Sequence, residues 1–495
     1  MFGWIKNIIG EIKELNGSVD SYRQDSVIQS LPTVACVNQA KKLIEEKKYD
    51  EAKEILKNAL DISTQDSRVY KYLGKIEEIR CEFAQAIKYY MSSVVLNPQD
   101  KEIWLRLGLC QLNHNQVGEA LKSFERGNKV TPFNSDILTG WGMALMKQKK
   151  YALARDKFID ATKVNKYNFS AILLSAIMEV RLCDYESAEM KLAFLAKVAP
   201  NESSNYEYAN LKLLKADYKA AETYAKKAIE INRQMLPAYF VLGEVYSRDG
   251  DIINTERVFN SAISYDLENE VLYCKWGEAY IRFFEFKKAN EKFAKALEFS
   301  PDYPEAKIGL ALTKALGGDF THVDELKERH GDNVYMQEAI GLQMWAKGKK
   351  EDAAEMFKKA LRTDSRQSFN LLHLARLYEQ LNNKTKTREY YEKFVVIHKE
   401  YLPALVEFSR WLISIGDIAD AQRKLRKAER LDKNNIEVLN MLFFTSYRLV
   451  KDNVCEYNIK EAISLAQKIQ SLGEFKYENE KAELEQILIN IQGTN

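Results

Sequence analysis

Apolar residues return at helical spacing through most of the chain, in a pattern that repeats about every 34 residues. Each period holds two stretches in which apolar positions recur three and four residues apart, and polar or turn-forming residues separate these stretches. Such spacing places the apolar side chains on one face of an α-helix. The pattern therefore predicts one antiparallel helix pair in each period.

Small and large residues keep fixed places within the period. Gly74, Gly108 and Gly142 are each followed by an alanine twelve residues later and by an aromatic residue four residues after that. The alanine–aromatic pairs are Ala86 with Tyr90, Ala120 with Phe124 and Ala154 with Phe158, and the frame returns at Gly277, Ala289 and Phe293 and at Gly341, Ala353 and Phe357. Small residues let two helices approach closely, and the aromatic ring fills the space between neighbouring pairs.

These residues resemble the tetratricopeptide repeat motif, most clearly in Trp104-x-x-Leu107-Gly108, Ala120-x-x-x-Phe124 and Pro132. The resemblance implies an all-α, right-handed superhelical solenoid of about 13 helix pairs. The repeats are placed at 33–66, 67–100, 101–134, 135–168, 169–201, 202–235, 236–269, 270–303, 304–333, 334–367, 368–401 and 402–435, with a thirteenth from 436. All eight prolines fall at or beside the predicted junctions, where the loss of a backbone N–H is tolerated.

Departures from the repeat divide the chain into five segments. The repeat at 304–333 is short and contains Gly317-Gly318, and the last repeat carries extra residues at 451–457. The predicted segments are an amphipathic helix with linker (1–32), a first block of repeats (33–303), the degenerate repeat (304–333), a second block (334–435), and an irregular last repeat with a C-terminal capping helix (436–495). A capping helix is expected because an open solenoid needs a polar end.

Residues 1–16 read as an amphipathic helix with Phe2, Ile5, Ile8 and Ile12 on one side. Three interpretations remain open. The helix could cap the array or pair with a second copy of itself, anchor a partner protein, or lie on a membrane surface. The membrane interpretation is not favoured because the polar face is not basic.

Composition narrows the classes of partner and compartment. The 73 basic and 71 acidic residues leave a net charge of +2, which supplies no broad attraction for nucleic acid. Six cysteines lie far apart without a Cys-x-x-Cys pair, so neither a disulfide framework nor a zinc site is expected. No apolar stretch is long enough to span a membrane. We expect a cytoplasmic protein, with attachment to a membrane surface or a larger assembly as the variant.

The family presents partner-binding residues on the first helix of each repeat, at its second, fifth, sixth, ninth, twelfth and thirteenth positions. Transferring these positions to the present chain gives apolar partner-binding candidates at Leu105, Leu109, Leu112, Met143, Met146, Leu173, Leu174, Ile177, Leu312, Leu342 and Trp345. The alternative interpretation is that several of them are core residues packed against the adjacent repeat. Elsewhere the same face is mixed, with Tyr206, Glu207, Asn210, Glu244, Arg248, His373, Arg376, Glu379, Glu407 and Arg410.

Two polar groupings on this face have a specific interpretation. His373, Arg376 and Glu379 are neighbours on one helix face and predict an exposed ion-pair cluster. Some family members clamp the C-terminal carboxylates of chaperones, but only Lys41 and Arg106 match fragments of that clamp here. A role as a chaperone-tail cochaperone is therefore not supported.

No phosphate loop, dinucleotide fingerprint or nucleophile elbow is found, and no cofactor or metal is expected. The repeats leave too few residues for a catalytic domain, so the chain is predicted not to be an enzyme. The favoured function is a protein–protein interaction scaffold or adaptor for complex assembly, which binds partner segments along its concave groove. The alternatives are a regulatory peptide sensor and the accessory substrate-binding subunit of a separate enzyme.

Overall fold

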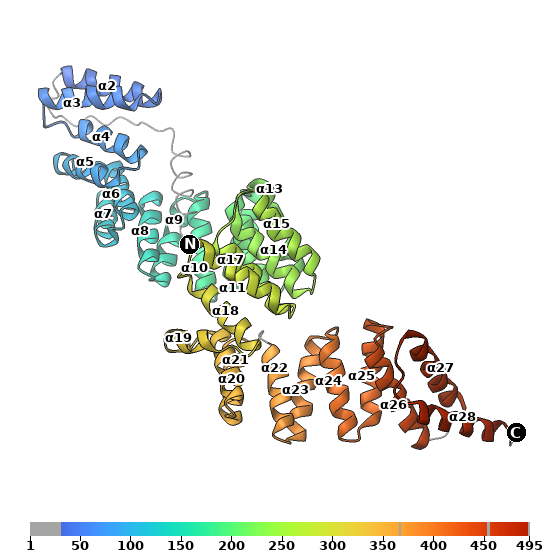
Figure 1. Ribbon diagram of the computed structural model, residues 1–495. Coiled ribbons are helices and arrows are strands. Elements are labelled where there is room, and N and C mark those ends of the chain that lie inside the picture. Colours follow the sequence, from blue (N-terminus) through green and yellow to red (C-terminus); the bar gives the residue numbers. More distant parts are fainter. Residues whose placement is uncertain (1–30, 366–367, 453–455, 494–495) are drawn as a thin grey trace. The chain divides into compact units, whose positions relative to one another are not determined.

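The computed structural model describes residues 31–365, 368–452 and 456–493, and the helix predicted at 1–16 lies outside them. Helices joined by short turns make up this part of the chain, and it contains no strand (Figure 1). The chain divides into two compact units, which we call unit 1 (up to Leu267) and unit 2 (from Glu268). Each is described by itself.

Unit 1 contains the first fourteen described helices. They are α2 (Leu31–Glu45), α3 (Tyr49–Ile62), α4 (Ser67–Ile79), α5 (Phe83–Leu96), α6 (Lys101–Asn113), α7 (Val117–Val130), α8 (Ser135–Lys147), α9 (Tyr151–Val164), α10 (Phe169–Arg181), α11 (Tyr185–Val198), α12 (Glu202–Leu214), α13 (Tyr218–Ile231), α14 (Leu236–Arg248) and α15 (Ile252–Ser264).

Unit 2 contains the remaining described helices. They are α16 (Glu270–Arg282), α17 (Phe286–Phe299), α18 (Pro304–Leu316), α19 (Thr321–His330), α20 (Val334–Ala346), α21 (Lys350–Thr363), α22 (Phe369–Gln380), α23 (Lys384–Ile397), α24 (Leu402–Ser414), α25 (Ile418–Leu431), α26 (Ile436–Asp452), α27 (Glu456–Leu472) and α28 (Glu478–Gly493).

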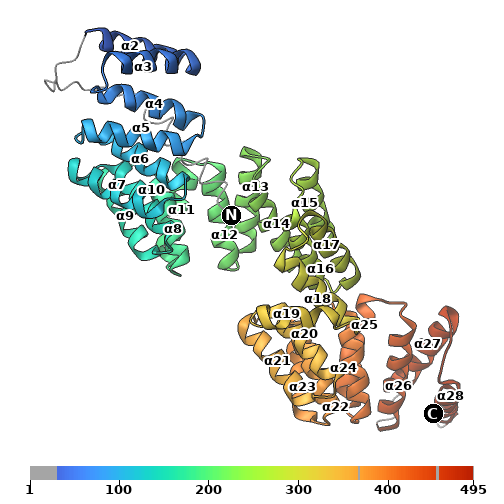
Figure 2. The ribbon, with the colours of Figure 1, turned by 60° about the vertical axis from the view of Figure 1, so that its left-hand side comes forward.

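Consecutive helices pack as antiparallel pairs, from α2 with α3 to α26 with α27, and α28 follows the last pair (Figure 2). The all-α solenoid of helix pairs predicted from the sequence is confirmed. The degenerate repeat has a short second helix, α19, of 10 residues. The extra residues of the last repeat lie in and between α26 and α27, which are 17 residues long each.

Local sequence sets the ends of the helices. Asp66, Asp100 and Asn134 are N-cap residues of α4, α6 and α8, and each accepts a hydrogen bond from a backbone N–H of the first turn. Pro237, Pro304 and Pro403 lie in the first turn of α14, α18 and α24. An N–H at that position has no partner within the helix, so proline begins a helix at little cost.

The glycines and aromatic residues of the repeat pack directly against each other. A Cβ added to Gly108 would lie 2.6 Å from the Phe124 ring, and one added to Gly140 would lie 2.5 Å from the same ring. Phe293 fits between Gly277 and Gly309 in the same way. Each ring therefore fills space that glycines open on the first helix of its own pair and of the next pair, as the sequence predicts.

The first helix of a pair also contacts the first helices of neighbouring pairs. In unit 1 these contacts join α2 to α4, α6 to α8, α10 to α12 and α12 to α14, and in unit 2 they join α16 to α18, α18 to α20 and α24 to α26. Each array therefore curves towards its first helices. We call the surface that these helices share the inner face of each unit.

One contact in unit 2 joins segments far apart in the sequence. Phe284, in the turn between α16 and α17, has a positive φ of 60°. Its ring centroid lies 4.9 Å from that of Phe369, 4.3 Å from that of Tyr401 and 5.2 Å from that of His398. The Phe284 cluster consists of Phe284, Phe286, Phe369, Phe394, His398 and Tyr401. It ties the first pair of unit 2 to α22, α23 and the start of α24.

Candidate partner-binding surface

Most of the apolar residues predicted to bind a partner are core residues. Eight of the eleven are at most 9% exposed: Leu109, Leu112, Met143, Met146, Leu173, Leu174, Ile177 and Leu312. Seven of these, all but Leu312, belong to one apolar cluster that joins α6, α8 and α10 to their second helices. The adjacent first helices cover them, so they offer a partner little surface. The structure thus corrects the predicted docking stripe in repeats three to five.

The other three candidates are half-buried and already in contact with their neighbours. Leu105 packs against the cluster of α6, α8 and α10. Leu342 and Trp345 pack against the core of α21 and α22. The Trp345 indole N–H donates a hydrogen bond to Gln380 Oε1 at 2.9 Å. A partner-binding role for these three residues stays a prediction.

The inner face of unit 1 carries a polar network where α4 and α6 meet. Glu78 is buried, and its Oε2 accepts a hydrogen bond from the Tyr90 hydroxyl at 2.7 Å and from Arg106 Nη1 at 3.1 Å. Arg106 also donates to Glu102, which pairs with Lys71 at 2.5 Å. Arg106 is therefore held by carboxylates of its own chain, which supports the rejection of a carboxylate clamp.

The pKa of Glu102 provides a test of this network. Burial raises the pKa of this carboxyl, but Arg106 and Lys71 outweigh burial and hold the pKa at about 2. A carboxyl whose pKa is lower in the folded state stabilises the fold above its unfolded-state pKa, and this stabilisation is lost as the pH falls towards the folded-state value. We expect Glu102→Gln to lower the urea midpoint of unit 1 at pH 7, and the difference from wild type to shrink between pH 4.5 and pH 3.

The matched control for this prediction is Glu119→Gln, which changes an exposed carboxyl in the first turn of α7. Its urea midpoint should differ little from that of wild type at any pH, because exposed ion pairs contribute little. A Glu102→Gln difference that is the same at pH 7 and pH 3 would show that the ion pairs do not stabilise the fold.

Unit 2 has a hollow of about 340 Å³ on its inner face. It is lined by Arg376, Glu379, Tyr391, Glu407, Arg410, Trp411 and Ser414. All of these except Tyr391 come from the first helices α22 and α24. Arg376 donates to both oxygens of Glu407, at 2.8 and 2.7 Å, and the Tyr391 hydroxyl donates to Glu379 at 3.2 Å. Glu379 and Ser414 are exposed, and the Arg410 side chain is 62% exposed.

The sequence predicts that His373, Arg376 and Glu379 form ion pairs with one another, and this prediction is wrong. His373 is 2% exposed, and its Nε2 lies 3.3 Å from Glu338 on the preceding first helix, α20. Arg376 pairs with Glu407 on the following first helix. The three side chains share a helix face as predicted, but they bind other helices instead of one another.

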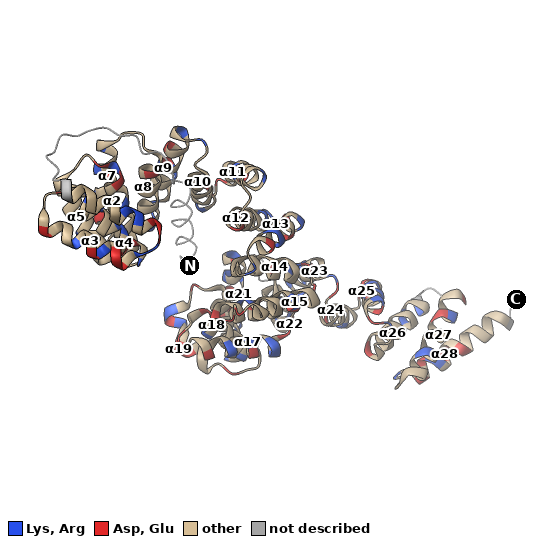
Figure 3. Cartoon of the chain, turned by 90° about the horizontal axis from the view of Figure 1, so that it is seen from above, with Lys and Arg blue, Asp and Glu red and all other residues tan. Residues whose placement is uncertain are grey.

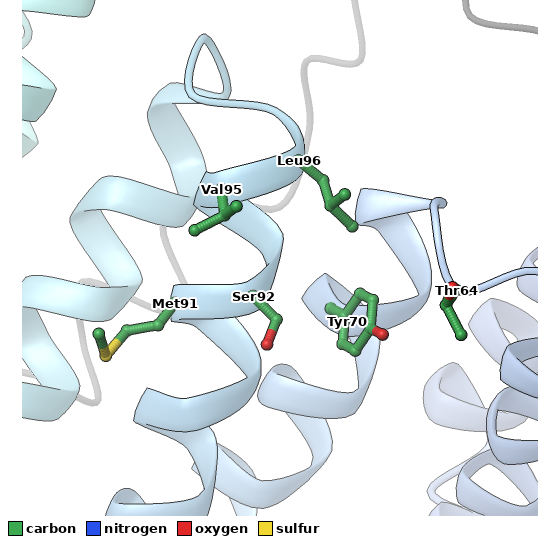
Figure 4. Close-up of a pocket in the computed structure, with 6 residues that line it drawn as sticks. All are labelled: Thr64, Tyr70, Met91, Ser92, Val95 and Leu96. Carbon is green, nitrogen blue, oxygen red and sulfur yellow. The ribbon is translucent and has the colours of Figure 1, made fainter.

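Sequence reasoning missed a second hollow of about 340 Å³ in unit 1, lined by Thr64, Tyr70, Met91, Ser92, Val95 and Leu96 (Figure 4). Met91 and Val95 lie on α5 and are 52% and 80% exposed. The signal in the sequence is that Lys88 is the one charged residue within α5. The hollow lies beside a second helix, so it is not part of the inner face.

Residues 31–365, 368–452 and 456–493 contain no group of three or more His, Cys, Asp and Glu side chains placed to hold a metal ion. Over the same residues, no helix combines the length and the hydropathy that crossing a membrane would require. Lys and Arg residues are interspersed with Asp and Glu residues within each unit (Figure 3).

The stacked pairs, their glycine–aromatic packing and the shared inner face define the class of a helical-repeat solenoid. Models of the tetratricopeptide repeat match residues 68–135, 202–235 and 370–400, which cover α4 to α7, α12 with α13, and α22 with α23. The chain is a tetratricopeptide repeat protein.

Two known proteins show how far the similarity extends. The human protein O-mannosyl-transferase TMTC3 is 23% identical over 290 residues, which are 55% of the present chain and 31% of TMTC3. The match therefore spans about a third of that relative. The crystal structure of the APC/C hetero-tetramer Cut9–Hcn1 contains a chain with a TM-score of 0.54 and 12% identity, and the alignment covers 92% of the present chain and 96% of that one. This second likeness concerns the fold alone.

Proposed function

We propose that the protein is a non-catalytic scaffold or assembly subunit that holds segments of partner proteins along the inner face of its first helices. The observation that carries the proposal is the hollow of about 340 Å³ on the inner face of unit 2. Its lining combines a tryptophan, two arginines and two glutamates, which suits a segment that offers apolar and polar groups together. Proteins of the tetratricopeptide repeat family generally bind other proteins, and the Cut9–Hcn1 neighbour is itself part of a hetero-tetramer.

The rim of the hollow offers a test that changes two exposed side chains. Glu379→Lys combined with Arg410→Glu exchanges two charges at the rim, and both side chains are exposed. We expect recovery of the main co-purifying protein from an extract of the source cells to fall at least tenfold with this double variant. The measurement is quantitative affinity purification with mass spectrometry, alongside a thermal unfolding curve of each variant.

The control exchanges the same charges on second helices of unit 2. Glu355→Lys lies on α21 and Arg423→Glu on α25, and these two side chains are 64% and 75% exposed. This variant should recover the partner as wild type does. Equal recovery with the inner-face and the control variants would remove the inner face of unit 2 as the binding surface.

A second candidate function is the substrate-binding part of an enzyme whose catalytic chain is separate. The similarity to part of a protein O-mannosyl-transferase favours it. In that case the co-purifying chain carries a transferase activity, and the activity on protein acceptors falls when the repeat protein is removed. Co-purification of chains without enzymatic activity would favour the scaffold.

A further inference from the structure

Carboxylates on the inner faces of both units are usually paired with a group of the chain itself. The pairs in unit 1 are Glu78 with Arg106, Glu102 with Lys71 and Glu244 with Arg248, and those in unit 2 are Glu278 with Lys275, Glu338 with His373, Glu407 with Arg376 and Glu437 with Arg410. These groups are satisfied before any partner arrives. An inner-face carboxylate without such a pair therefore indicates a place where a ligand could supply the missing partner.

The helix α12 of unit 1 carries such an unpaired carboxylate, Glu207. Tyr206, Glu207 and Asn210 occupy the fifth, sixth and ninth positions of α12, which lie on one face of the helix. All three side chains are half-buried. None of them makes a hydrogen bond or an ion pair with any residue that the structure describes. Within the described part of the chain, the polar atoms of these three side chains therefore remain available to a ligand.

The surroundings of Glu207 disfavour its charge. Burial raises the pKa of this carboxyl to about 7, although Arg181 at the end of α10 lowers it. Arg181 does not pair with Glu207, and its guanidinium lies 6.0 Å from the centroid of the Tyr151 ring. Several charged groups on the helices around α12 pair with one another: Glu244 with Arg248 on α14, Glu179 with Lys191 on α10 and α11, and Glu189 and Asp217 with Lys212.

We propose that the inner face at α12 binds a basic segment of a partner protein, in which a Lys or Arg side chain donates hydrogen bonds to Glu207. The proposal rests on the proposed function, because it names the chemistry of a partner segment and a second place on the inner face where one is held. It also assigns a different type of ligand to each unit. The hollow in unit 2 is lined by paired charges, whereas α12 offers an unpaired acceptor.

A cation fits this site better than an anion or an apolar group. An ionised carboxylate only accepts hydrogen bonds, so its natural partners are ammonium and guanidinium groups. Tyr206 is half-buried beside Glu207, and the next first helix places the half-buried Phe240 at the position equivalent to Tyr206. Aromatic faces near a carboxylate add cation–π attraction for the same ligand.

Proton linkage gives the site a characteristic pH dependence. Glu207 is about half protonated at pH 7 in the free protein, and a bound cation favours the ionised form. The complex therefore holds fewer protons than the free protein, and affinity rises with pH. Between pH 6 and pH 8 the dissociation constant should fall about tenfold, as follows from a free pKa of about 7 and a much lower bound pKa.

The experiment uses the full chain and a random 12-residue peptide library displayed on phage. Selected peptides should carry a Lys or Arg, and replacing that residue with norleucine should weaken binding at least tenfold by calorimetry. Glu207→Gln keeps the shape of the side chain and removes its charge. It should weaken the basic peptide at least tenfold and abolish the pH dependence between pH 6 and pH 8. Glu230→Gln, on the exposed side of α13, should leave both unchanged.

The outcomes separate this site from the proposed function. Selected peptides that Glu207→Gln does not weaken, but that the Glu379→Lys, Arg410→Glu variant does, would refute the basic site and leave the inner face as a binding surface. Peptides that bind better at pH 6 than at pH 8 would show that a protonated Glu207 donates to a neutral segment, which also overturns the proposal. Peptides insensitive to both variants would overturn the inner face itself.

Discussion

Replacing Ala120 with aspartate should lower the free energy of unfolding of unit 1 by about 3 kcal/mol or more. Ala120 is 0% exposed on α7 and belongs to the apolar cluster that contains Phe124 and Ile137. A carboxylate at this position has no partner and no access to water. In a repeat array each pair stabilises its neighbours, so the loss should extend from α6 to α9. Denaturant unfolding followed by circular dichroism, with hydrogen exchange of the α6–α9 amides, measures both effects.

The matched control for Ala120→Asp introduces the same residue two positions earlier. Gly118 is exposed in the first turn of α7, and a Cβ added there meets nothing within 4 Å. Gly118→Asp should change stability by no more than about 0.5 kcal/mol, because surface substitutions rarely do more and an acidic residue suits a helix N-terminus. If Ala120→Asp unfolds at the same denaturant concentration as Gly118→Asp, the close packing of α6 and α7 is not what stabilises this pair.

The fold could be predicted because its main packing contact repeats in the sequence. Gly108 and Phe124 touch across one helix pair, and their separation of sixteen residues is short enough to recur visibly at each period. Gly140 touches the same ring from the next pair, which explains why a small residue is also favoured there. Local spacing therefore carries most of the information about the solenoid.

The inner surface could not be predicted in the same way. Met143 and Leu173 occupy positions at which the family presents groove residues, but they are 2% and 4% exposed. Helical spacing places a side chain on the inner face, yet it does not tell how closely the next first helix approaches. Because α6 contacts α8 and α10 contacts α12, these apolar side chains are buried between the first helices and belong to the core.

The sequence alone also does not show which side chains on other helices pair with a given charged residue. His373 and Arg376 lie one turn apart, but one binds Glu338 on the preceding first helix and the other binds Glu407 on the following one. Glu244 has Arg248 four residues later, whereas Glu207 has no basic residue three or four positions away, but this spacing does not show whether another helix supplies a partner. The pairs of His373 with Glu338 and of Arg376 with Glu407 join residues 35 and 31 positions apart, so only the stacked structure shows them.

Replacing Phe284 with alanine should destabilise unit 2 by about 2–4 kcal/mol. The Phe284 ring, in the turn after α16, packs against the side chains of Phe369, His398 and Tyr401. Its backbone has a φ of 60°, a conformation in which the equivalent turns at Gly250, Gly318, Gly348 and Gly416 carry glycine. This conformation costs a bulky residue about 1–2 kcal/mol, and the ring contacts of Phe284 offset that cost.

Two further variants separate the ring from the backbone. Phe284→Gly removes the ring and relieves the backbone, so it should be about 1 kcal/mol more stable than Phe284→Ala and still less stable than wild type. Lys149 also has a positive φ of 60° but is exposed, so Lys149→Ala should leave stability unchanged. Denaturant unfolding and hydrogen exchange at α16, α17 and α22 report the loss. If Phe284→Gly were at least as stable as wild type, the aromatic contacts would contribute no net stability, and unit 2 would be held together by its neighbouring pairs alone.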